Sequence, residues 1–487
     1  MNESQRRRRH ATDLKDVDAR LAGRPDDVEL RFKRAKLLDA LGSTGEAHAA
    51  YVEVLKRDPK HFGALNDFGM LLYKGGYTAD ARTCYAAAVT NHPENPIGHA
   101  NFAFTLLKGG EAEKAREHYE IALRLDPNNV EAHRGLALAL AALGEREAAE
   151  EHRAIGFRGN AVTTLPYRGE GKPVPLLLLV TETSGNVNTD RLIDDRVFLV
   201  SKVVVEYYDE VMPLPRHDLI FNALGDADVC APGLRIAATI AAKSGAPIVN
   251  DPQRVLQTGR AENARRLRTL AGVAAPQIAA LPRGLLGGVG GVAALAEQGF
   301  TYPLLVRTPG FHTGQNFLKV EAAADLAQAV AQVPGEELLA IEFLDVRSAD
   351  GKVRKYRAII VDGRLYPLHL AIADYWKVHY FSADMADRPE HRAEEAAFLE
   401  NMEAALGPRA MAALANVRDV LGLDYAGVDF SLDRSGRLAV FEANATMVIP
   451  PPKRDERWNY RIAPAEHVID AVRTMLIERS RSYHGIT

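Results

Sequence analysis

The sequence predicts a multidomain chain in which an all-helical repeat array precedes a region of alternating strands and helices. Two observations lead to this prediction. Prolines recur every 34 residues through the first third of the chain, and short apolar runs alternate with polar or glycine-bearing segments through the rest. At 487 residues the chain is too long for one hydrophobic core, so we expect several domains.

The composition argues against several classes of protein. A hydrophobic content of 47% and a charged content of 25% are typical of globular chains, and a net charge of -4 predicts no nucleic-acid partner. Cys84 and Cys230 have no partner at metal-ligand spacing, which fits a reducing cytoplasm and argues against a disulfide scaffold. The apolar runs are shorter than the roughly 20 residues that cross a bilayer, so we expect no membrane span. No apolar segment follows the basic run at residues 6–9, which argues against a signal peptide and predicts a solvated tail.

The first 160 residues repeat with a period of 34. Four positions keep this register: Pro25, Pro59, Pro93 and Pro127; Gly42, Gly76, Gly110 and Gly144; Ala47, Ala81, Ala115 and Ala149; Tyr51, Tyr85 and Tyr119. The period, with small residues where helices cross and a proline after each second helix, resembles the tetratricopeptide repeat (TPR). The resemblance implies an all-α solenoid of four helix hairpins over residues 1–165. It also implies a groove that binds a peptide or protein segment; a docking or dimerisation surface is the alternative, so a homodimer stays possible.

Residues 158–175 lack helical periodicity, and we place a domain boundary there. Short apolar runs then predict strands at 175–181, 197–207, 219–223 and 246–249, and a helix at 232–244. This alternation predicts a parallel sheet flanked by helices. Because such sheets bind ligands beyond the carboxyl ends of their strands, we expect Asn222 to contact a substrate.

The pattern changes from Tyr302 onward. Further strands are predicted at 303–307, 317–320 and 338–343, and a hairpin at 355–361 and 364–369. A helix is predicted to begin near Ala322, and the glycine-rich residues 284–292 are interpreted as a flexible connector.

Residues 422–444 are the most informative stretch of the chain. A turn centred on Ser435 and Gly436 places Asp429 opposite Glu442 on one face, and Asn444 joins that face two residues later. Like charges opposed on a sheet are destabilising unless they are neutralised, and Mg²⁺ prefers oxygen ligands of this kind. The pattern therefore predicts a metal site; the alternative, two carboxylates facing solvent, is disfavoured by the flanking apolar residues. On this reasoning Glu442→Gln holds or raises the stability of the ligand-free protein.

This hairpin resembles the metal-binding end of ATP-grasp enzymes, in which an Asp on one strand and a Glu-x-Asn on the next hold Mg²⁺. It is similar to D-alanine:D-alanine ligases and to the enzymes that add glutamate to ribosomal proteins. The resemblance implies an α/β pre-ATP-grasp domain at 172–255 and an α+β ATP-grasp domain at 256–482. It also implies ATP and Mg²⁺ as cofactors, and a ligase that joins a small-molecule or peptide carboxylate to an amine or another nucleophile through an acyl phosphate. The alternative is a TPR scaffold whose ATP-grasp module binds nucleotide without turnover.

The same resemblance implies roles for individual residues. Arg260 and Arg307 would bind the ATP phosphates, and residues Gly310 to Gly314 would form a loop that covers these phosphates. Glu342, Phe343 and Leu344 would form the hinge that recognises adenine. Arg357 would lie beside the transferred phosphoryl group. The family often has lysine at the two phosphate-binding positions, but arginine also binds phosphate, bidentately and with permanent charge. The segment after Asn444 departs from the family pattern, so no acceptor pocket is implied.

Residues 366–380 are rich in groups that bind anions and transfer protons. We expect His369 and Lys377 to contact substrate or phosphate, and His369 to take part in catalysis. The alternative is a packed aromatic cluster that includes Trp376, His379 and Tyr380.

Overall fold

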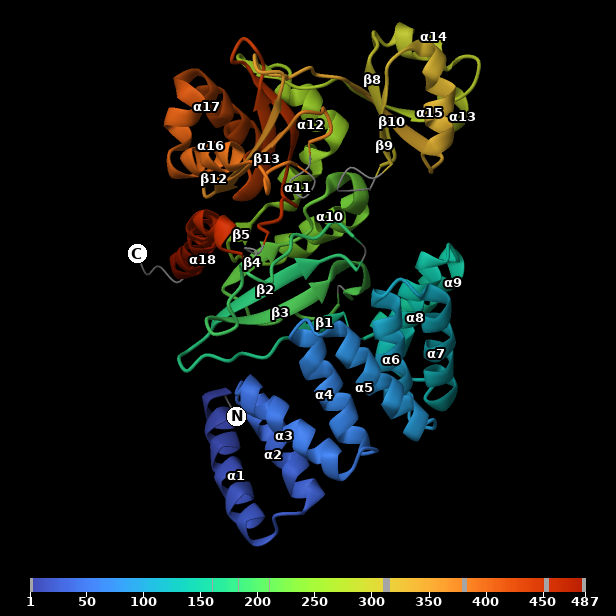
Figure 1. The fold of residues 1–487 in the computed structure, drawn as a ribbon, viewed down its shortest axis with the longest axis vertical. Helices are drawn as coiled ribbons and strands as arrows, with labels where there is room; N and C mark the ends of the chain where they lie inside the picture. Colours follow the sequence, from blue (N-terminus) through green and yellow to red (C-terminus); the bar gives the residue numbers. More distant parts are fainter. Residues whose placement is uncertain are drawn as a thin grey trace. The chain divides into compact units, whose positions relative to one another are not determined.

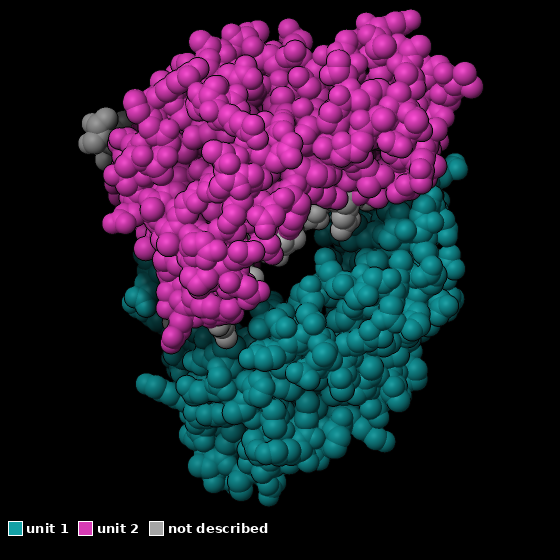
Figure 2. All heavy atoms as spheres, turned by 45° about the horizontal axis from the view of Figure 1, so that its top comes forward, with its two compact units in different colours: residues 1–163, 167–172 teal, residues 164–166, 173–487 magenta. Residues whose placement is uncertain are grey.

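The computed structural model describes residues 3–159, 161–182, 184–209, 211–309, 316–378, 383–450 and 455–483. Contacts divide the chain into two compact units (Figure 2). Unit 1 comprises residues 1–163 and 167–172, and unit 2 comprises residues 164–166 and 173–487. An all-helical region thus precedes a mixed α/β region, as predicted, while the finer division of unit 2 at residues 255 and 256 stays a prediction. No helix among the described residues combines the length and the apolar character that a membrane span requires.

Unit 1 is built from antiparallel helix hairpins (Figure 1). Its helices are α1 (Glu3–Gly23), α2 (Val28–Ala40), α3 (Thr44–Arg57), α4 (Phe62–Lys74), α5 (Thr78–Asn91), α6 (Pro96–Lys108), α7 (Ala112–Leu125), α8 (Val130–Ala142) and α9 (Arg146–Phe157). Helices α2 to α9 pair in sequence order into the four predicted repeats. The turn glycine of each repeat has a positive φ, +78° at Gly42 and +85° at Gly76, which other residues adopt at a cost. A Cβ on Gly69 would lie 2.8 Å from the Tyr85 ring, so this crossing requires a small residue.

Residues 6–9 belong to helix α1, and Arg8 and Arg9 are exposed to solvent as predicted. The segment is a helix rather than a frayed tail. The reason is the apolar stripe that follows it. Val17 is fully buried, and Leu14 packs against the core shared by α2 to α5. This contact, rather than the composition of the basic run, determines the structure of the segment.

Repeats three and four each contain a histidine pair at the same position. His99 Nδ1 lies 3.0 Å from His118 Nδ1, and His99 Nε2 lies 2.9 Å from the Pro93 carbonyl oxygen. The arrangement recurs 34 residues later, where His133 and His152 approach to 2.9 Å. Only one nitrogen of each facing pair can carry a hydrogen, because a second hydrogen would set two N–H donors against each other.

We expect the stability of unit 1 to fall in acid. Burial, and then the facing histidine, lower the pKa values of His118 and His152 from that of an unfolded chain, about 6.5. The unfolded state therefore binds protons more readily, and stability that is complete above about pH 6.5 is lost as the pH falls below it. The double variant His118→Asn and His152→Asn should show a smaller fall in melting temperature between neutral and acidic buffer than wild type. His48→Asn, on the exposed surface, is the control, and an unchanged fall in the double variant would contradict the assignment.

The described residues of unit 2 form three sheets. In the first, called the parallel sheet, β2 (Val174–Val180) pairs in parallel with β3 (Phe198–Val204) and β4 (Leu219–Asn222), and β4 pairs with β5 (Ile248–Val249). β1 (Val162–Thr164) ends at the first residue of this unit, and the amide of the next residue, Leu165, donates to the Val200 carbonyl oxygen of β3. The flanking helices are η1 (Val205–Tyr207), α10 (Ala227–Ala242) and α11 (Pro252–Val255). Helix α10 begins before the predicted residue 232 because Asp226 caps its first amides, and a non-helical Cys230 accommodates Pro232.

The second sheet, called the small sheet, has the order β7 (Ile278–Pro282), β10 (Glu337–Glu342), β8 (Leu304–Arg307), β9 (Phe317–Val320), and its pairs are antiparallel. Helices α13 (Arg283–Leu286), α14 (Gly291–Glu297), η3 (Ala323–Asp325) and α15 (Leu326–Gln332) belong to the same lobe (Figure 1). The interpretation of residues 284–292 as a flexible connector is wrong for most of their length. Leu286 and Leu295 are buried in the core of this lobe, and they anchor α13 and α14.

The third sheet, called the large sheet, has the order β12 (Arg364–Ala373), β11 (Val353–Val361), β13 (Tyr425–Leu432), β14 (Leu438–Asn444), β6 (Val273–Ala274). Its longer strands pair antiparallel, and both predicted hairpins are present. The remaining helices of the unit are η2 (Leu256–Thr258), α12 (Arg260–Leu267), α16 (Pro389–Glu400), α17 (Met402–Leu421), η4 (Glu456–Arg461) and α18 (Ile462–Tyr483).

Candidate functional site

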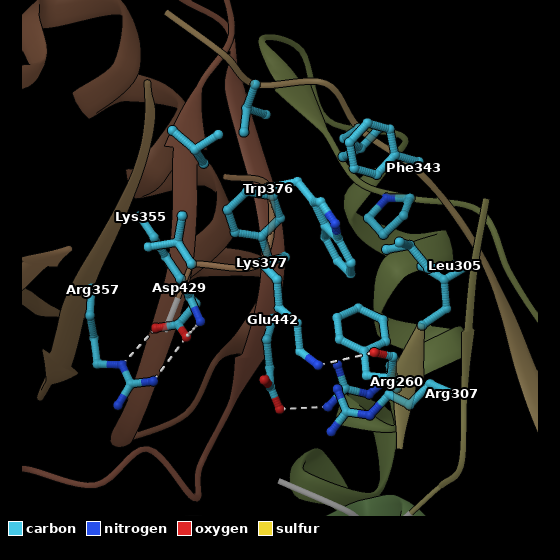
Figure 3. Close-up of a pocket in the computed structure, with 18 of the residues that line it drawn as sticks. Arg260, Leu305, Arg307, Phe343, Lys355, Arg357, Trp376, Lys377, Asp429 and Glu442 are labelled. Carbon is cyan, nitrogen blue, oxygen red and sulfur yellow. Dashed lines mark hydrogen bonds and ion pairs between the residues drawn. The ribbon is translucent and has the colours of Figure 1, made fainter. Parts of the chain in front are cut away.

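A cavity of about 800 Å³ lies in unit 2 and is lined by residues of the small and large sheets (Figure 3). The small sheet contributes an apolar wall that includes Ile278, Leu305 and Ile341. The large sheet contributes charged side chains from β11, β13 and β14. The cavity therefore has an apolar end and a charged end, and its volume is that of a typical small-molecule site.

The charged end is built on a row of four residues that are register partners on adjacent strands. His369 on β12 pairs with Arg357 on β11, Arg357 pairs with Asp429 on β13, and Asp429 pairs with Glu442 on β14. Partners directly opposite on a sheet share a face, and all four line the cavity. The residues predicted for catalysis, His369 and Arg357, thus lie in one row across the sheet with the predicted carboxylate pair.

The register of the carboxylate hairpin agrees with the prediction, although the turn does not. Leu432 pairs with Leu438, which centres the turn on Ser435 rather than between Ser435 and Gly436. A bulge at Phe441 shifts the pairing by one residue and restores Asp429 opposite Glu442. The bulge also places Phe441 in the cavity wall.

Asp429 is neutralised by two cations of the neighbouring strand. Arg357 donates to both of its carboxylate oxygens, at 2.6 and 2.9 Å, and Lys355 Nζ lies 2.7 Å from Oδ2. The side chain of Asp429 is 1% exposed. Burial raises its pKa, but the Arg357 and Lys355 cations outweigh burial, so the net pKa lies below the usual range and the group is ionised.

Glu442 has partners of its own. Arg260 Nη2 donates to Glu442 Oε1 at 2.7 Å, and the Asn444 amide donates to the same oxygen at 2.9 Å. Burial raises the pKa of Glu442, the Arg260 cation lowers it, and the net shift is downward. The oxygen of the Asn444 side chain accepts from the amide and hydroxyl of Thr446, and Asn444 does not line the cavity. Both donors of Thr446 therefore use the side-chain oxygen that the sequence predicts as a metal ligand.

These contacts supply the neutralising charge that the sequence pattern assigned to a metal ion, and the metal site itself stays a prediction. Asp429 and Glu442 do oppose each other, but arginine and lysine side chains neutralise them, so the hairpin itself requires no divalent cation. Within the described residues, no group of three or more His, Cys, Asp or Glu side chains is arranged to hold a metal ion. The two carboxylates fit Mg²⁺ only as part of a set in which a ligand supplies further oxygens.

Arg307 lies at the junction of the two ends of the cavity. It is on β8, is 9% exposed, and its guanidinium lies 5.6 Å from the centroid of the Phe317 ring. Burial, and then the Arg260 cation, lower the pKa of Arg307 to about 10, so it stays charged at neutral pH. Two adjacent cations that are both partly buried favour an anion between them.

The predicted hinge residues border the apolar end. Glu342, Phe343 and Leu344 all line the cavity at the end of β10. Glu342 is already hydrogen-bonded to the main chain of Gln277. The main-chain oxygen of Gln277 accepts from the Glu342 amide at 2.8 Å, and the main-chain amide of Gln277 donates to Glu342 Oε2 at 2.9 Å. Phe343 and Leu344 are therefore better placed than Glu342 to contact a ligand.

The other predicted residues have mixed outcomes. Lys377 lines the cavity, and burial lowers its pKa. His369 is 2% exposed, and burial, and then the Arg357 cation, hold its pKa well below the usual value. The predicted substrate role of Asn222 is wrong, because this residue is fully buried and does not line the cavity. Its side-chain amide instead donates to the Leu224 and Asn250 carbonyl oxygens and so stabilises the end of β4. Gly310, Gly314, His379 and Tyr380 lie outside the described residues.

Several residues that line the cavity were not predicted from the sequence. Lys355 precedes Arg357 by two positions, and strand alternation alone would have placed both on one face. Lys319 follows Phe317 by two positions on β9, so strand alternation places these two side chains on one face as well. Lys319 Nζ lies 4.1 Å from the centroid of the Phe343 ring. No local pattern marks Phe441, because its position depends on the bulge.

Comparisons with known proteins identify the N-terminal region. A family model described as "Tetratricopeptide repeat" matches residues 32–96, and one described as "TPR repeat" matches residues 105–144. The N-terminal region consists of tetratricopeptide repeats. In a comparison with curated proteins, no match was found.

Solved structures also match the chain. MamA 41-end from Desulfovibrio magneticus RS-1 is 24% identical over 32% of this chain and 89% of that chain, with a TM-score of 0.29. YrrB, described as a TPR protein with an unusual peptide-binding site, is 20% identical over 29% of this chain and 73% of that chain, with a TM-score of 0.27.

Proposed function

We propose that unit 2 is an ATP-grasp module that binds ATP in the cavity between the small and large sheets and acts as an ADP-forming ligase. One observation carries the proposal: an apolar end bounded by Phe343 is continuous with an end where four cations face two carboxylates. The cations are Arg260, Arg307, Lys355 and Arg357, and the carboxylates are Asp429 and Glu442. The surplus of positive charge favours a polyanion, and the apolar end favours a flat base attached to it.

In this proposal the protein positions its ligands and neutralises their charge. Arg260 and Arg307 hold the phosphates, and Arg357 lies beside the phosphoryl group that moves to a carboxylate substrate. As phosphate oxygens replace carboxylate oxygens around the cations, Asp429 and Glu442 become available as oxygen ligands. Mg²⁺, when bound there, would supply charge neutralisation for phosphoryl transfer. His369 stays neutral at physiological pH and lies opposite Arg357 in the row of four register partners.

The TPR region would recruit a peptide or protein, either as the substrate or as a partner of the ligase. A second candidate function is a TPR scaffold that binds nucleotide without turnover. The internal ion pairs favour this candidate, because both carboxylates already have cationic partners. ADP formation that depends on an added carboxylate and amine distinguishes the ligase from the scaffold.

We expect ATP with Mg²⁺ to raise the melting temperature of the full chain, and Mg²⁺ alone to do little. A ligand at about 100 times its Kd that binds only the folded state stabilises it by about 2.7 kcal/mol. Mg²⁺ without ATP would have to displace the arginine and lysine side chains from Asp429 and Glu442. The displaced cations would then have no anion to contact, so binding of the metal alone is unfavourable. The test is thermal unfolding with ATP, Mg²⁺, both and neither, with inorganic tripolyphosphate as a probe of the cationic end. No shift with ATP and Mg²⁺ at about 1 mM would remove nucleotide binding from the proposal.

A further inference from the structure

Residues 374–378, called here the crossing segment, follow β12 of the large sheet and line the cavity. Lys377 Nζ in this segment donates a hydrogen bond to the main-chain oxygen of Phe317 on the small sheet, at 3.1 Å. Val378 instead packs into an apolar cluster with Ala371 of the large sheet. The crossing segment is therefore held by both of the sheets that border the cavity.

Trp376 is the largest side chain of the crossing segment, and it packs on the apolar cluster of the small sheet that includes Leu305 and Ile341. Its ring centroid lies 5.5 Å from that of Phe317 and 6.1 Å from that of Phe343, at interplanar angles of 73° and 82°. Neither phenyl ring lies parallel to the indole. In Figure 3 the Trp376 side chain extends toward the side of the cavity that carries Phe343 and Leu305. The indole thus stands at a steep angle to each of the two phenyl rings, and the three rings give the cavity an aromatic lining suited to a flat ligand.

The aromatic lining is continuous with the cationic end. The Phe317 ring has the Arg307 guanidinium at 5.6 Å and Lys377 Nζ at 5.9 Å from its centroid. One ligand could therefore place a flat ring against Trp376 and a negatively charged chain against Arg307 and Arg260. A sugar phosphate or a dicarboxylate would satisfy only the second of these contacts.

We infer that Trp376 is the base-stacking residue of the site, and that it makes the cavity select purine nucleoside triphosphates over anions that carry no base. The inference deepens the proposed function and rests on it. Stacking of a base on an aromatic side chain contributes enough to affinity that its loss is readily measured, and it tolerates exchange of one aromatic ring for another. A purine covers more of the indole than a pyrimidine does, so ATP and GTP should bind more tightly than CTP and UTP.

Tryptophan fluorescence gives the first test, because the chain has only two tryptophans. Trp458 is 4% exposed, stacks under the Arg461 guanidinium at 4.0 Å, and does not line the cavity. ATP should quench the emission of the full chain, and Trp458→Phe should keep this response. Trp376→Phe should lose the response while it still binds ATP in calorimetry. Quenching that persists in Trp376→Phe would overturn the inference.

Affinity gives the second test. Trp376→Ala should raise the Kd for ATP by about tenfold or more, as expected for loss of a stacked base, while Trp376→Phe should raise it only a few-fold. The Kd for inorganic tripolyphosphate, which has no base, should change by less than about twofold in Trp376→Ala. An ATP affinity that is unchanged in Trp376→Ala, or an equal loss for ATP and tripolyphosphate, would overturn the inference and leave nucleotide binding in place. A wild-type chain that binds neither compound would instead overturn the proposed function.

Discussion

Asp429→Asn is expected to lower the free energy of unfolding of unit 2 by about 3 kcal/mol in the absence of ligand, because removing one member of a buried ion pair leaves the others uncompensated. Arg357 and Lys355 are each 19% exposed, and both depend on this carboxylate. Denaturant unfolding of the full chain measures the change. Asp470→Asn, which removes a 69% exposed carboxylate of α18, is the control and should cost no more than about 0.5 kcal/mol.

The same variant tests the anion-binding character of the cavity. If Arg357 and Lys355 can exchange a carboxylate for phosphate, tripolyphosphate should stabilise Asp429→Asn more than it stabilises wild type. Equal stabilisation of the two proteins would indicate that phosphate does not reach these cations. A variant as stable as wild type would show that the ion pairs contribute nothing measurable.

Glu442→Gln is expected to destabilise the ligand-free protein and to remove most of the Mg²⁺ dependence of ATP binding. The first expectation reverses the one drawn from the sequence, where repulsion between Asp429 and Glu442 dominated. Arg260, 16% exposed, would lose the carboxylate that it contacts at 2.7 Å. The loss of Mg²⁺ dependence follows if an ATP phosphate replaces the Glu442 carboxylate beside Arg260. Glu442 is then available to bind Mg²⁺ through its oxygens.

Calorimetry of ATP binding with and without Mg²⁺ measures the second effect. We expect Mg²⁺ to tighten ATP binding to wild type by about tenfold or more, and to change binding to Glu442→Gln by much less. The reciprocal variant Arg260→Gln and the double variant complete a cycle, in which a coupling of about 1 to 3 kcal/mol in unfolding would confirm the pair. An equal effect of Mg²⁺ on both proteins would remove Glu442 from any metal site.

The repeat period of the TPR region, and its four helix hairpins, could be predicted from the sequence. Its structure depends on contacts within one hairpin and with the next, so the 34-residue period of prolines, glycines and tyrosines carries the information locally. Helix α1 is the exception, because it is stabilised by Leu14 packing on the core of the first repeats, a contact that its basic run does not indicate.

The pairing of Asp429 with Glu442 was also predicted from strand alternation and a turn signal, but in the structure it depends on the bulge at Phe441, which no local pattern marks. What neutralises that pair was decided by the tertiary structure alone. Arg357 is 72 residues from Asp429 along the chain, and Arg260 is 182 residues from Glu442. Spacing in the sequence shows which side chains share a face of one hairpin, but not which strand lies beside it. The electrostatics of a buried site depend on that neighbour, because charges brought together by folding act at contact distance in surroundings that screen them weakly.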